Sequence, residues 1–322
     1  MNWIIGIAVL VIVGYLLDRE IWFYEGVHLG PRAQAWLYDR WSRKYDDGKR
    51  ESQLRDDEML AQPLLDATKD VQTPFVLDFA TGTGRLSYAL TRRPEFKGHI
   101  IALDLSQGML EQAYQKLSRA EWRDGVPPSS SRSADEQDTI YSNPTPASTT
   151  GFDTADNHRL LNPPGSEEII NVEFLRHLAL PLPFPDNSFD VVCALEVLEL
   201  FPNMDEPLAE FARVLRPGGL LISSRGTEAS GRRAKVKSVE AYTSLLAKYG
   251  FENIQVTKWW KLFDRALAVK SGSSSPVGAR HLHDVLRCSQ CGDIQWEQVA
   301  SRWTCVNCGN GLSLTGEGIV LG

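Results

Sequence analysis

A buried apolar strand that ends in an acid and runs into a glycine turn constrains the fold of this chain more than any other feature. The strand and turn span Val76 to Gly84, VLDFATGTG, and the next apolar run, 100–103, ends in a second acid, Asp104. Glycines after a strand let the backbone approach a ligand closely, and a carboxylate at the tip of the next strand can accept hydrogen bonds from ribose hydroxyls. The pattern predicts a nucleoside-cofactor site at the ends of two neighbouring strands.

The same turn narrows the class of cofactor. The separation of Gly84 and Asp104 is near the value of about 20 residues that suits NAD and S-adenosylmethionine equally. The segment 82–87, GTGRLS, lacks the third glycine that brings a dinucleotide pyrophosphate to a helix N-terminus. The sequence also has no Gly-Lys-Ser/Thr phosphate loop, so nothing supports nucleotide hydrolysis. The turn therefore favours a cofactor without phosphates.

Four sequence blocks follow one another in the order known from one enzyme superfamily. They lie at 78–84 (DFATGTG), 104–110 (DLSQGML), 182–192 (LPFPDNSFDVV) and 214–219 (VLRPGG). In these blocks the chain resembles class I S-adenosylmethionine-dependent methyltransferases, and within them the branch of the ubiquinone and menaquinone biosynthesis methyltransferases. The resemblance covers roughly 38–270 and implies a methyltransferase domain over 71–270.

The resemblance also implies which residues bind S-adenosylmethionine. Asp78, Gly82 and Gly84 would line the methionine half, Asp104 would hold the ribose, and Met109 would lie against adenine. Leu178 stands where relatives usually have an acid that accepts a hydrogen bond from the adenine amino group, so the backbone amide of Ala179 becomes the group expected to reach the ring. The full expected set is Asp78, Ala80, Thr81, Gly82, Gly84, Asp104, Leu105, Met109 and Ala179.

Two acids follow the fourth expected strand. Residues at the carboxyl end of a strand face the ligand crevice in this architecture, so Glu196 and Glu199 are the acid/base candidates of the catalytic domain. The alternative is that both are helix-starting acids beside a positively charged sulfonium. Methyl transfer needs no base, because the protein's main task is to hold the nucleophile in line with the activated methyl group.

Strand and helix patterns alternate along the chain. We expect strands at 75–79, 99–103, 169–175, 189–195, 220–224, 254–259 and 265–269, and helices at 86–91, 107–117, 204–214 and 239–248. This alternation specifies the α/β class, with a doubly wound, mostly parallel seven-stranded Rossmann-like sheet covered on both faces. The last two strands are too close for a helical crossover and should form an antiparallel hairpin at the sheet edge.

A proline- and serine-rich stretch interrupts this alternation. We expect the region 119–165 to be a disordered insertion, because it is too polar to build a core. Asn162-Pro163-Pro164-Gly165 within it is superficially like the motif of amino-directed nucleic-acid methyltransferases. It precedes the third strand and lacks the aromatic residue, so we assign it no function.

The first residues form a separate element. The run 3–17 carries no charge until Asp18, and as a helix it rises about 22 Å, against about 30 Å for a hydrocarbon core. We expect 1–24 to be a retained membrane anchor, the alternatives being a signal peptide or a buried core helix. Basic residues follow the run and none precedes it, which predicts a single-pass protein whose catalytic domain faces the cytoplasm.

The segment 25–70 connects this element to the sheet. Its pattern predicts one or two amphipathic helices. The resemblance implies that such a helix forms a lid over the cofactor. Tyr45 is a candidate to contact the cofactor site, the alternative being a helix that merely packs on the sheet. The acids Asp56, Asp57 and Glu58 are interpreted as a solvated helix face or start.

Four of the five cysteines form two tight pairs near the C-terminus. Cys288 and Cys291, and then Cys305 and Cys308, have Cys-x-x-Cys spacing, and each pair is followed by glycine. Such pairs suit structural zinc with all four positions filled by protein, and rubredoxin-like iron is the alternative. We expect a zinc ribbon over 280–312 behind a flexible serine-rich linker, 271–279.

These features predict a membrane-tethered methyltransferase that acts on a small, lipophilic acceptor. The net charge of −7 argues against broad electrostatic binding of nucleic acid. Acidic and basic residues nearly cancel in the zinc ribbon, which favours contact with a protein partner, or docking of the ribbon on the core, over nucleic acid. One alternative is an RNA or protein methyltransferase that uses the ribbon for substrate recognition. Another is a scaffold that keeps the fold without catalysis.

Overall fold

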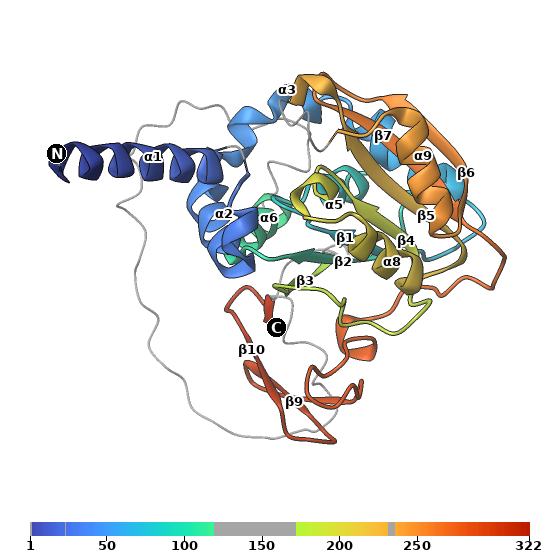
Figure 1. Ribbon diagram of the computed structural model, residues 1–322. Helices are drawn as coiled ribbons and strands as arrows, with labels where there is room; N and C mark the ends of the chain where they lie inside the picture. The colour runs from blue at the N-terminus through green and yellow to red at the C-terminus, as the bar shows by residue number, and fades with distance from the viewer. Residues whose placement is uncertain (1, 23, 119–171, 231–235) are drawn as a thin grey trace, which may run out of the picture.

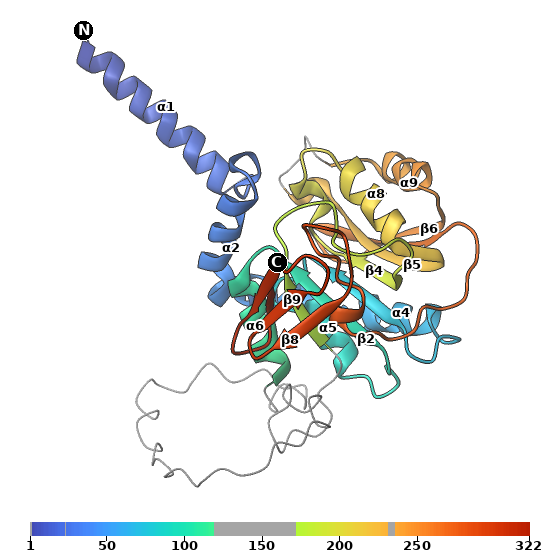
Figure 2. The ribbon, with the colours of Figure 1, turned by 90° about the horizontal axis from the view of Figure 1, so that it is seen from below.

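The computed structural model describes residues 2–22, 24–118, 172–230 and 236–322 (Figures 1 and 2). The expected insertion 119–165 and the motif Asn162-Pro163-Pro164-Gly165 lie outside these residues, as do the first residues of the expected strand 169–175.

Among the described residues, seven strands form the part of the sheet that carries the glycine turn. Their order is β6-β7-β5-β4-β1-β2-β3. The strands are β1 (Phe75–Phe79), β2 (His99–Asp104), β3 (Val172–Arg176), β4 (Phe189–Ala194), β5 (Leu215–Gly226), β6 (Phe251–Lys258) and β7 (Phe263–Lys270). Strands β1 to β5 run parallel, β7 is antiparallel to β5, and β6 is antiparallel to β7. The predicted parallel core with an antiparallel edge hairpin is confirmed.

Helices cover both faces of this sheet, as the fully buried strands β1, β2 and β4 require. The helices of this region are α4 (Gln62–Ala67), α5 (Arg85–Thr91), α6 (Gln107–Ser118), η4 (Leu198–Leu200), α8 (Asp205–Val214), η5 (Glu228–Ser230) and α9 (Val239–Lys248). Phe211 of α8 and Leu246 of α9 pack in one core cluster, whereas Leu64 of α4 and Leu90 of α5 pack in another. The sheet is therefore doubly wound.

The N-terminal helix α1 (Asn2–Trp22) projects away from the body of the protein in both views (Figures 1 and 2). Among the residues described, no helix combines the length and apolarity needed to cross a membrane. The predicted spanning anchor is therefore not found. The physical reason is that Asp18, Arg19 and Glu20 lie inside the helix, which leaves an uncharged run shorter than a hydrocarbon core.

Several short helices link α1 to the sheet. They are η1 (Val27–Leu29), α2 (Pro31–Tyr45), η2 (Asp46–Gly48), α3 (Arg50–Gln53) and η3 (Asp57–Ala61). Helix α2 lies beside α6 (Figure 1), so part of the predicted helical connector covers the carboxyl ends of β1 and β2. Asp57 and Glu58 are exposed as predicted, but Asp56 is buried, which corrects the interpretation of that acid as solvated.

The C-terminal part extends the same sheet. After η6 (Leu282–Asp284) come β8 (Trp296–Val299), β9 (Arg302–Cys305), β10 (Gly311–Leu314) and β11 (Val320–Leu321). Because β11 pairs with β3, the sheet continues as β3-β11-β10-β9-β8 and has eleven strands. Docking of the C-terminal part on the core was one of the expected contacts, but the strand pairing was not expected. The predicted boundary at 312 falls inside β10, and the predicted linker donates hydrogen bonds to Asp190 from the amides of Val277 and Gly278.

Candidate active site

Asp78 lies at the carboxyl end of β1 and is almost fully buried. Its Oδ2 accepts hydrogen bonds from the hydroxyls of Thr81, at 2.6 Å, and Ser87, at 3.2 Å. Burial raises the pKa of Asp78 to about 6 in spite of these two donors. A buried carboxyl of this kind at the tip of a strand suits a cationic ligand.

The turn after β1 has left-handed backbone at three of its positions. Ala80, Gly82 and Gly84 have φ angles of 53°, 56° and 76°. A Cβ atom on Gly82 would point into open space and meet only Tyr45, at 3.9 Å, whereas one on Gly84 would meet the Cβ of Ala113 at 3.0 Å. Gly82 therefore leaves room for a ligand, while Gly84 lets α5 and α6 pack closely.

Asp104 lies at the carboxyl end of β2, next to the turn. Its Oδ2 accepts a hydrogen bond from the amide of Gly82 at 2.8 Å, and its Oδ1 accepts one from the amide of Ser106 at 2.9 Å. Burial raises the pKa of Asp104 to about 6. Met109 is buried on α6, close behind this acid in the sequence. The two expected acids and the turn thus come together at one edge of the sheet.

Helix α2 and the turn after it are tied onto this edge. Asp39 Oδ1 accepts hydrogen bonds from the hydroxyl of Ser106, at 2.6 Å, and from the amide of Gly108, at 2.8 Å. Asp46 accepts a hydrogen bond from the Thr83 hydroxyl at 2.6 Å and pairs with the Lys116 ammonium, also at 2.6 Å. This segment, residues 31–48, therefore packs over the glycine turn, and we refer to it as the lid.

The lid leaves a small cleft beside the turn. The cleft has a volume of about 50 Å³ and is lined by Asp78, Gly82, Thr83, Tyr45 and Glu196, among others. Ligand pockets commonly measure about 300–1,000 Å³, so the cleft is smaller than the space that a nucleoside needs. Tyr45 lines the cleft, as expected of a lid residue.

Glu196 lies two residues past the end of β4, in left-handed backbone with a φ of 54°. Its carboxylate pairs with the ammonium of Lys49 and, at 3.0 Å, with the guanidinium of Arg85. Arg85 also forms two hydrogen bonds to the buried Asp56, at 2.5 and 2.6 Å. Burial raises the pKa of Asp56 to about 6. This charged network closes one side of the cleft.

Lys49, Arg85 and Asp56 were not among the predicted site residues. Lys49 and Asp56 belong to the connector, where charges are expected to face solvent, and Arg85 looks like an ordinary first residue of a helix. The signal that could have indicated a role was the position of Arg85 directly after the glycine turn.

A second, larger cavity adjoins the cleft. It measures about 340 Å³ and shares Tyr45, Lys49 and Glu196 with the cleft. The remaining lining residues are Trp22, Glu25, Tyr38, Trp41, Ser230, Leu262 and Phe263. Trp41 stacks with Trp22 at a ring separation of 5.9 Å and meets Tyr38 edge-on at 5.5 Å. The walls are thus largely aromatic, with Lys49 and Glu196 on the side shared with the cleft and Glu25 hydrogen-bonded to the Tyr38 hydroxyl.

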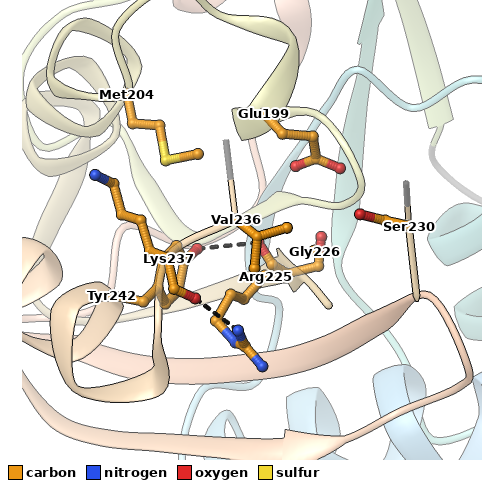
Figure 3. A pocket seen from close by; sticks show the side chains of 9 residues that line it. Glu199, Met204, Arg225, Gly226, Ser230, Val236, Lys237 and Tyr242 are labelled. Carbon is orange, nitrogen blue, oxygen red and sulfur yellow. Dashed lines mark hydrogen bonds between the residues drawn. The ribbon is translucent and has the colours of Figure 1, made fainter. Parts of the chain in front are cut away.

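Glu199 does not share a described cavity with Glu196. It is buried and lines a cavity of about 10 Å³ together with Arg225, Ser230 and Tyr242 (Figure 3). In this cavity Arg225 donates a hydrogen bond to the carbonyl of Lys237 at 2.6 Å, and Tyr242 donates one to the carbonyl of Ser224 at 3.1 Å. Of the two predicted acid/base candidates, only Glu196 therefore lines the cleft and the aromatic cavity.

The segment after β3 carries the remaining expected residue. Ala179 is exposed, and Leu178 is half-buried. The amide of His177 donates a hydrogen bond to the carbonyl of Asp104 at 2.9 Å, which holds the start of this segment beside the tip of β2. The expected contact of Ala179 with adenine stays a prediction.

The four C-terminal cysteines come together as the sequence predicts. Their sulfur atoms all lie within 4.8 Å of one another. The Sγ atoms of Cys288 and Cys308 are 3.5 Å apart, and those of Cys291 and Cys305 are 3.6 Å apart. A tetrahedral zinc ion with Zn–S bonds of about 2.3 Å needs sulfur atoms roughly 3.8 Å apart, so the four thiolates fit zinc.

Comparison with known proteins identifies the domain that holds the cleft. Two family models, each described as a methyltransferase domain, match residues 76–165 and 139–223. Together the two models span residues 76–223, so this part of the chain is similar to S-adenosylmethionine-dependent methyltransferase domains.

The chain is similar to several curated methyltransferases over part of their length. It is 48% identical over 54 residues to the fatty-acid O-methyltransferase of Mycolicibacterium smegmatis, covering 17% of this chain and 20% of that protein. It is 43% identical over 82 residues to the phthiotriol/phenolphthiotriol dimycocerosates methyltransferase of Mycobacterium leprae, covering 24% and 28%. It is 27% identical over 146 residues to the demethylmenaquinone methyltransferase of Listeria monocytogenes, covering 45% and 42%. The chain thus spans less than half the length of these relatives.

Among solved structures, a S-adenosylmethionine-dependent methyltransferase from Aquifex aeolicus aligns with 72% of this chain and 98% of its own. The TM-score is 0.45 and the sequence identity is 18%.

Proposed function

We infer that this chain transfers the methyl group of S-adenosylmethionine to a small, lipophilic acceptor. The single observation that carries the inference is the contact between two cavities: the cleft beside the glycine turn and the aromatic cavity share Tyr45, Lys49 and Glu196. A methyl donor in the first cavity and an acceptor in the second would meet at these three side chains.

The buried acids fit the cofactor. Asp78 would lie near the positively charged methionine half, and Asp104 would accept hydrogen bonds from the ribose hydroxyls. Gly82 leaves space for the ligand next to the backbone. When bound, the cofactor supplies an activated methyl group on sulfur. The residues of the chain then have to hold the acceptor atom in line, at about 3–3.5 Å from the methyl carbon, and to exclude water.

The lining of the larger cavity indicates the class of acceptor. Rings from Trp22, Tyr38, Trp41 and Phe263 offer apolar surface for an aromatic or alkyl body. Lys49 stays cationic: burial alone would lower its pKa, but Tyr45 and Glu196 outweigh burial and raise it. A polar or anionic head on the acceptor would face this ammonium. The acceptors named for the fatty-acid and demethylmenaquinone methyltransferases have this mixed character.

Glu196 lies where the cleft and the aromatic cavity meet, and its contacts suit a positioning role better than proton transfer. Its carboxylate is already engaged at both oxygens, Oε2 by the ammonium of Lys49 and Oε1 by the guanidinium of Arg85. We propose that Glu196 orients Lys49 between the two cavities. The zinc expected at the four cysteines has all its positions filled by protein, so its role is structural.

Transfer of a labelled methyl group to the components of a cell extract tests the proposed function. Purified protein is incubated with methyl-labelled S-adenosylmethionine and a cell extract, and the label is then counted separately in the lipid extract, the protein and the RNA. We expect more label in the lipid extract than in the same extract without the protein, and a much smaller excess with the Asp104→Ala variant at a limiting cofactor concentration. Label only in protein or RNA would contradict the acceptor class, and no transfer to any fraction would contradict catalysis.

A further inference from the structure

We propose that metal binding by the four cysteines sets how tightly the methyltransferase domain holds its cofactor, because the metal module braces β3 and the segment after it. The metal module is residues 280–322, and the brace consists of its contacts with β3. This inference rests on the proposed function for the identity of the cofactor, S-adenosylmethionine, but the brace itself can be tested without it.

The first contact is a strand pairing. Val320 and Leu321 of β11 lie opposite Leu175 and Arg176 of β3 in a parallel ladder. The amide of Gly322 adds a hydrogen bond to the carbonyl of Arg176 at 3.0 Å. Figure 1 shows the C-terminus next to β3. Without the module, β3 would be an edge strand with unpaired backbone groups.

The second contact is a shared core. Side chains of the module are buried in the same hydrophobic cluster as Leu175 of β3 and Leu182 and Phe184 of the next segment. The module residues in this cluster are Leu282, Val285, Leu286, Trp303 and Val320, each no more than 4% exposed. The module therefore packs as part of the domain, and its loss would expose this apolar surface to water.

The third contact passes through Glu173 of β3. Its Oε2 accepts a hydrogen bond from the amide of Leu282 at 2.7 Å and lies 2.7 Å from the Nε2 of His99, at the start of β2. The Nδ1 of His281 lies 3.6 Å from the same oxygen. Burial raises the pKa of Glu173, but hydrogen bonding with His281 and His99 outweighs burial and holds the pKa down to about 2. Glu173 thus joins β2, β3 and the module.

The braced strand leads directly to the cofactor site. Arg176 lies opposite Asp104 in the sheet register, and the next residue, His177, donates its amide hydrogen to the carbonyl of Asp104 at 2.9 Å. The side chain of Arg176 also donates to the carbonyl of Leu105 at 3.3 Å. A shift of β3 would therefore move the backbone around the acid that is expected to bind the ribose.

The metal fixes the residues that make the brace. Leu286 precedes Cys288 by two positions, and Trp303 precedes Cys305 by two positions on β9. Small modules with a four-cysteine site depend on their metal for folding. Removal of the metal should thus release Leu286 and Trp303 from the shared core, and β11 from β3.

Metal removal in the full-length chain is the first test. The zinc-loaded protein, the chelator-treated protein and the Cys308→Ser variant are compared by calorimetric titration with S-adenosylmethionine and by amide hydrogen exchange. We expect at least tenfold weaker cofactor binding and faster exchange in β3 and 177–180 after metal loss. Equal affinity and equal exchange would overturn the proposal.

A matched pair of variants separates the brace from general unfolding. Val320→Asp places a charge in the buried junction, whereas Val299→Asp places the same charge on β8, where Val299 is 72% exposed. Neither residue is a metal ligand, so both variants should retain one zinc per chain. We expect only Val320→Asp to weaken cofactor binding and to speed exchange in β3; equal behaviour of the two variants would overturn the proposal.

The two proposals fail in different ways. A zinc-loaded wild type that binds no S-adenosylmethionine would contradict the proposed function. Exchange in β3 that is insensitive both to metal loss and to Val320→Asp would contradict the brace, whatever the cofactor.

Discussion

The carboxylate of Asp104 accepts a hydrogen bond from the backbone amide of Gly82 at 2.8 Å. This contact joins the acid at the tip of β2 to the glycine turn at the tip of β1. Because each carboxylate oxygen has two lone pairs, Asp104 can keep its bonds to Gly82 and Ser106 and still accept bonds from two ribose hydroxyls. Asp104 thus keeps capacity to accept further hydrogen bonds while it holds the glycine turn.

Cofactor affinity should fall as the solution becomes acidic. Burial raises the pKa of Asp78 and of Asp104 to about 6, and the ionised forms are the ones that attract a cationic, hydroxyl-bearing ligand. We expect a constant dissociation constant for S-adenosylmethionine above pH 7. At pH 5 we expect about tenfold weaker binding for each of the two carboxyls, and so about 100-fold weaker binding in all. Titration calorimetry across this range measures the effect, with circular dichroism as the control for folding. The same affinity at both pH values would contradict the assignment.

Asp78→Asn should stabilise the fold at neutral pH while it weakens cofactor binding. A carboxyl whose pKa is raised on folding binds more protons in the folded state between about pH 4 and pH 6, so its contribution to stability is lost as the pH rises through that window. The amide oxygen of asparagine can still accept the hydrogen bonds of Thr81 and Ser87.

For this variant we expect a gain of about 1–3 kcal/mol in the free energy of unfolding at pH 7 and little change at pH 4. Urea unfolding at the two pH values checks the prediction. A variant that is less stable than the wild type at pH 7 would show that the ionised Asp78 is a stabilising group.

Asp46→Asn should loosen the lid. The variant loses the charge that pairs Asp46 with Lys116 and weakens its bond to Thr83. The neighbouring Asp47→Asn is the matched control, because Asp47 pairs only at the surface, with Arg50 at 3.3 Å. We expect several-fold faster association of S-adenosylmethionine with Asp46→Asn in stopped-flow measurements and no change with Asp47→Asn. Equal rates in both variants would mean that the lid does not limit entry.

The sheet could be predicted from the sequence because its strands are marked locally. Apolar runs such as Phe75–Phe79 are buried on both faces and are bounded by turn residues, so their type and their parallel arrangement follow from pattern alone. The two acids and the glycine turn were predictable for the same reason: each lies at the end of such a run. The four cysteines carry their own spacing signal.

The rest of the site depends on contacts between distant segments. Lys49 meets Glu196, and Asp56 meets Arg85, across the junction of connector and sheet, and a charged residue in a helix does not show whether it will be buried. The pairing of β11 with β3 was equally hidden, because a strand of two residues, Val320–Leu321, is too short to leave a pattern. The predicted membrane anchor is not found among the described residues, because Asp18, Arg19 and Glu20 lie inside the helix and shorten its uncharged run.

Titration of S-adenosylmethionine into the zinc-loaded, full-length protein tests the central claim most directly. We expect saturable binding by the wild type and by Asp70→Ala, which changes an exposed acid, and about 10–100-fold weaker binding by Asp104→Ala, since hydrogen bonds to a charged group contribute about 1.5–3 kcal/mol. No binding by the wild type, or equal binding by Asp104→Ala, would contradict a cofactor site at the tips of β1 and β2.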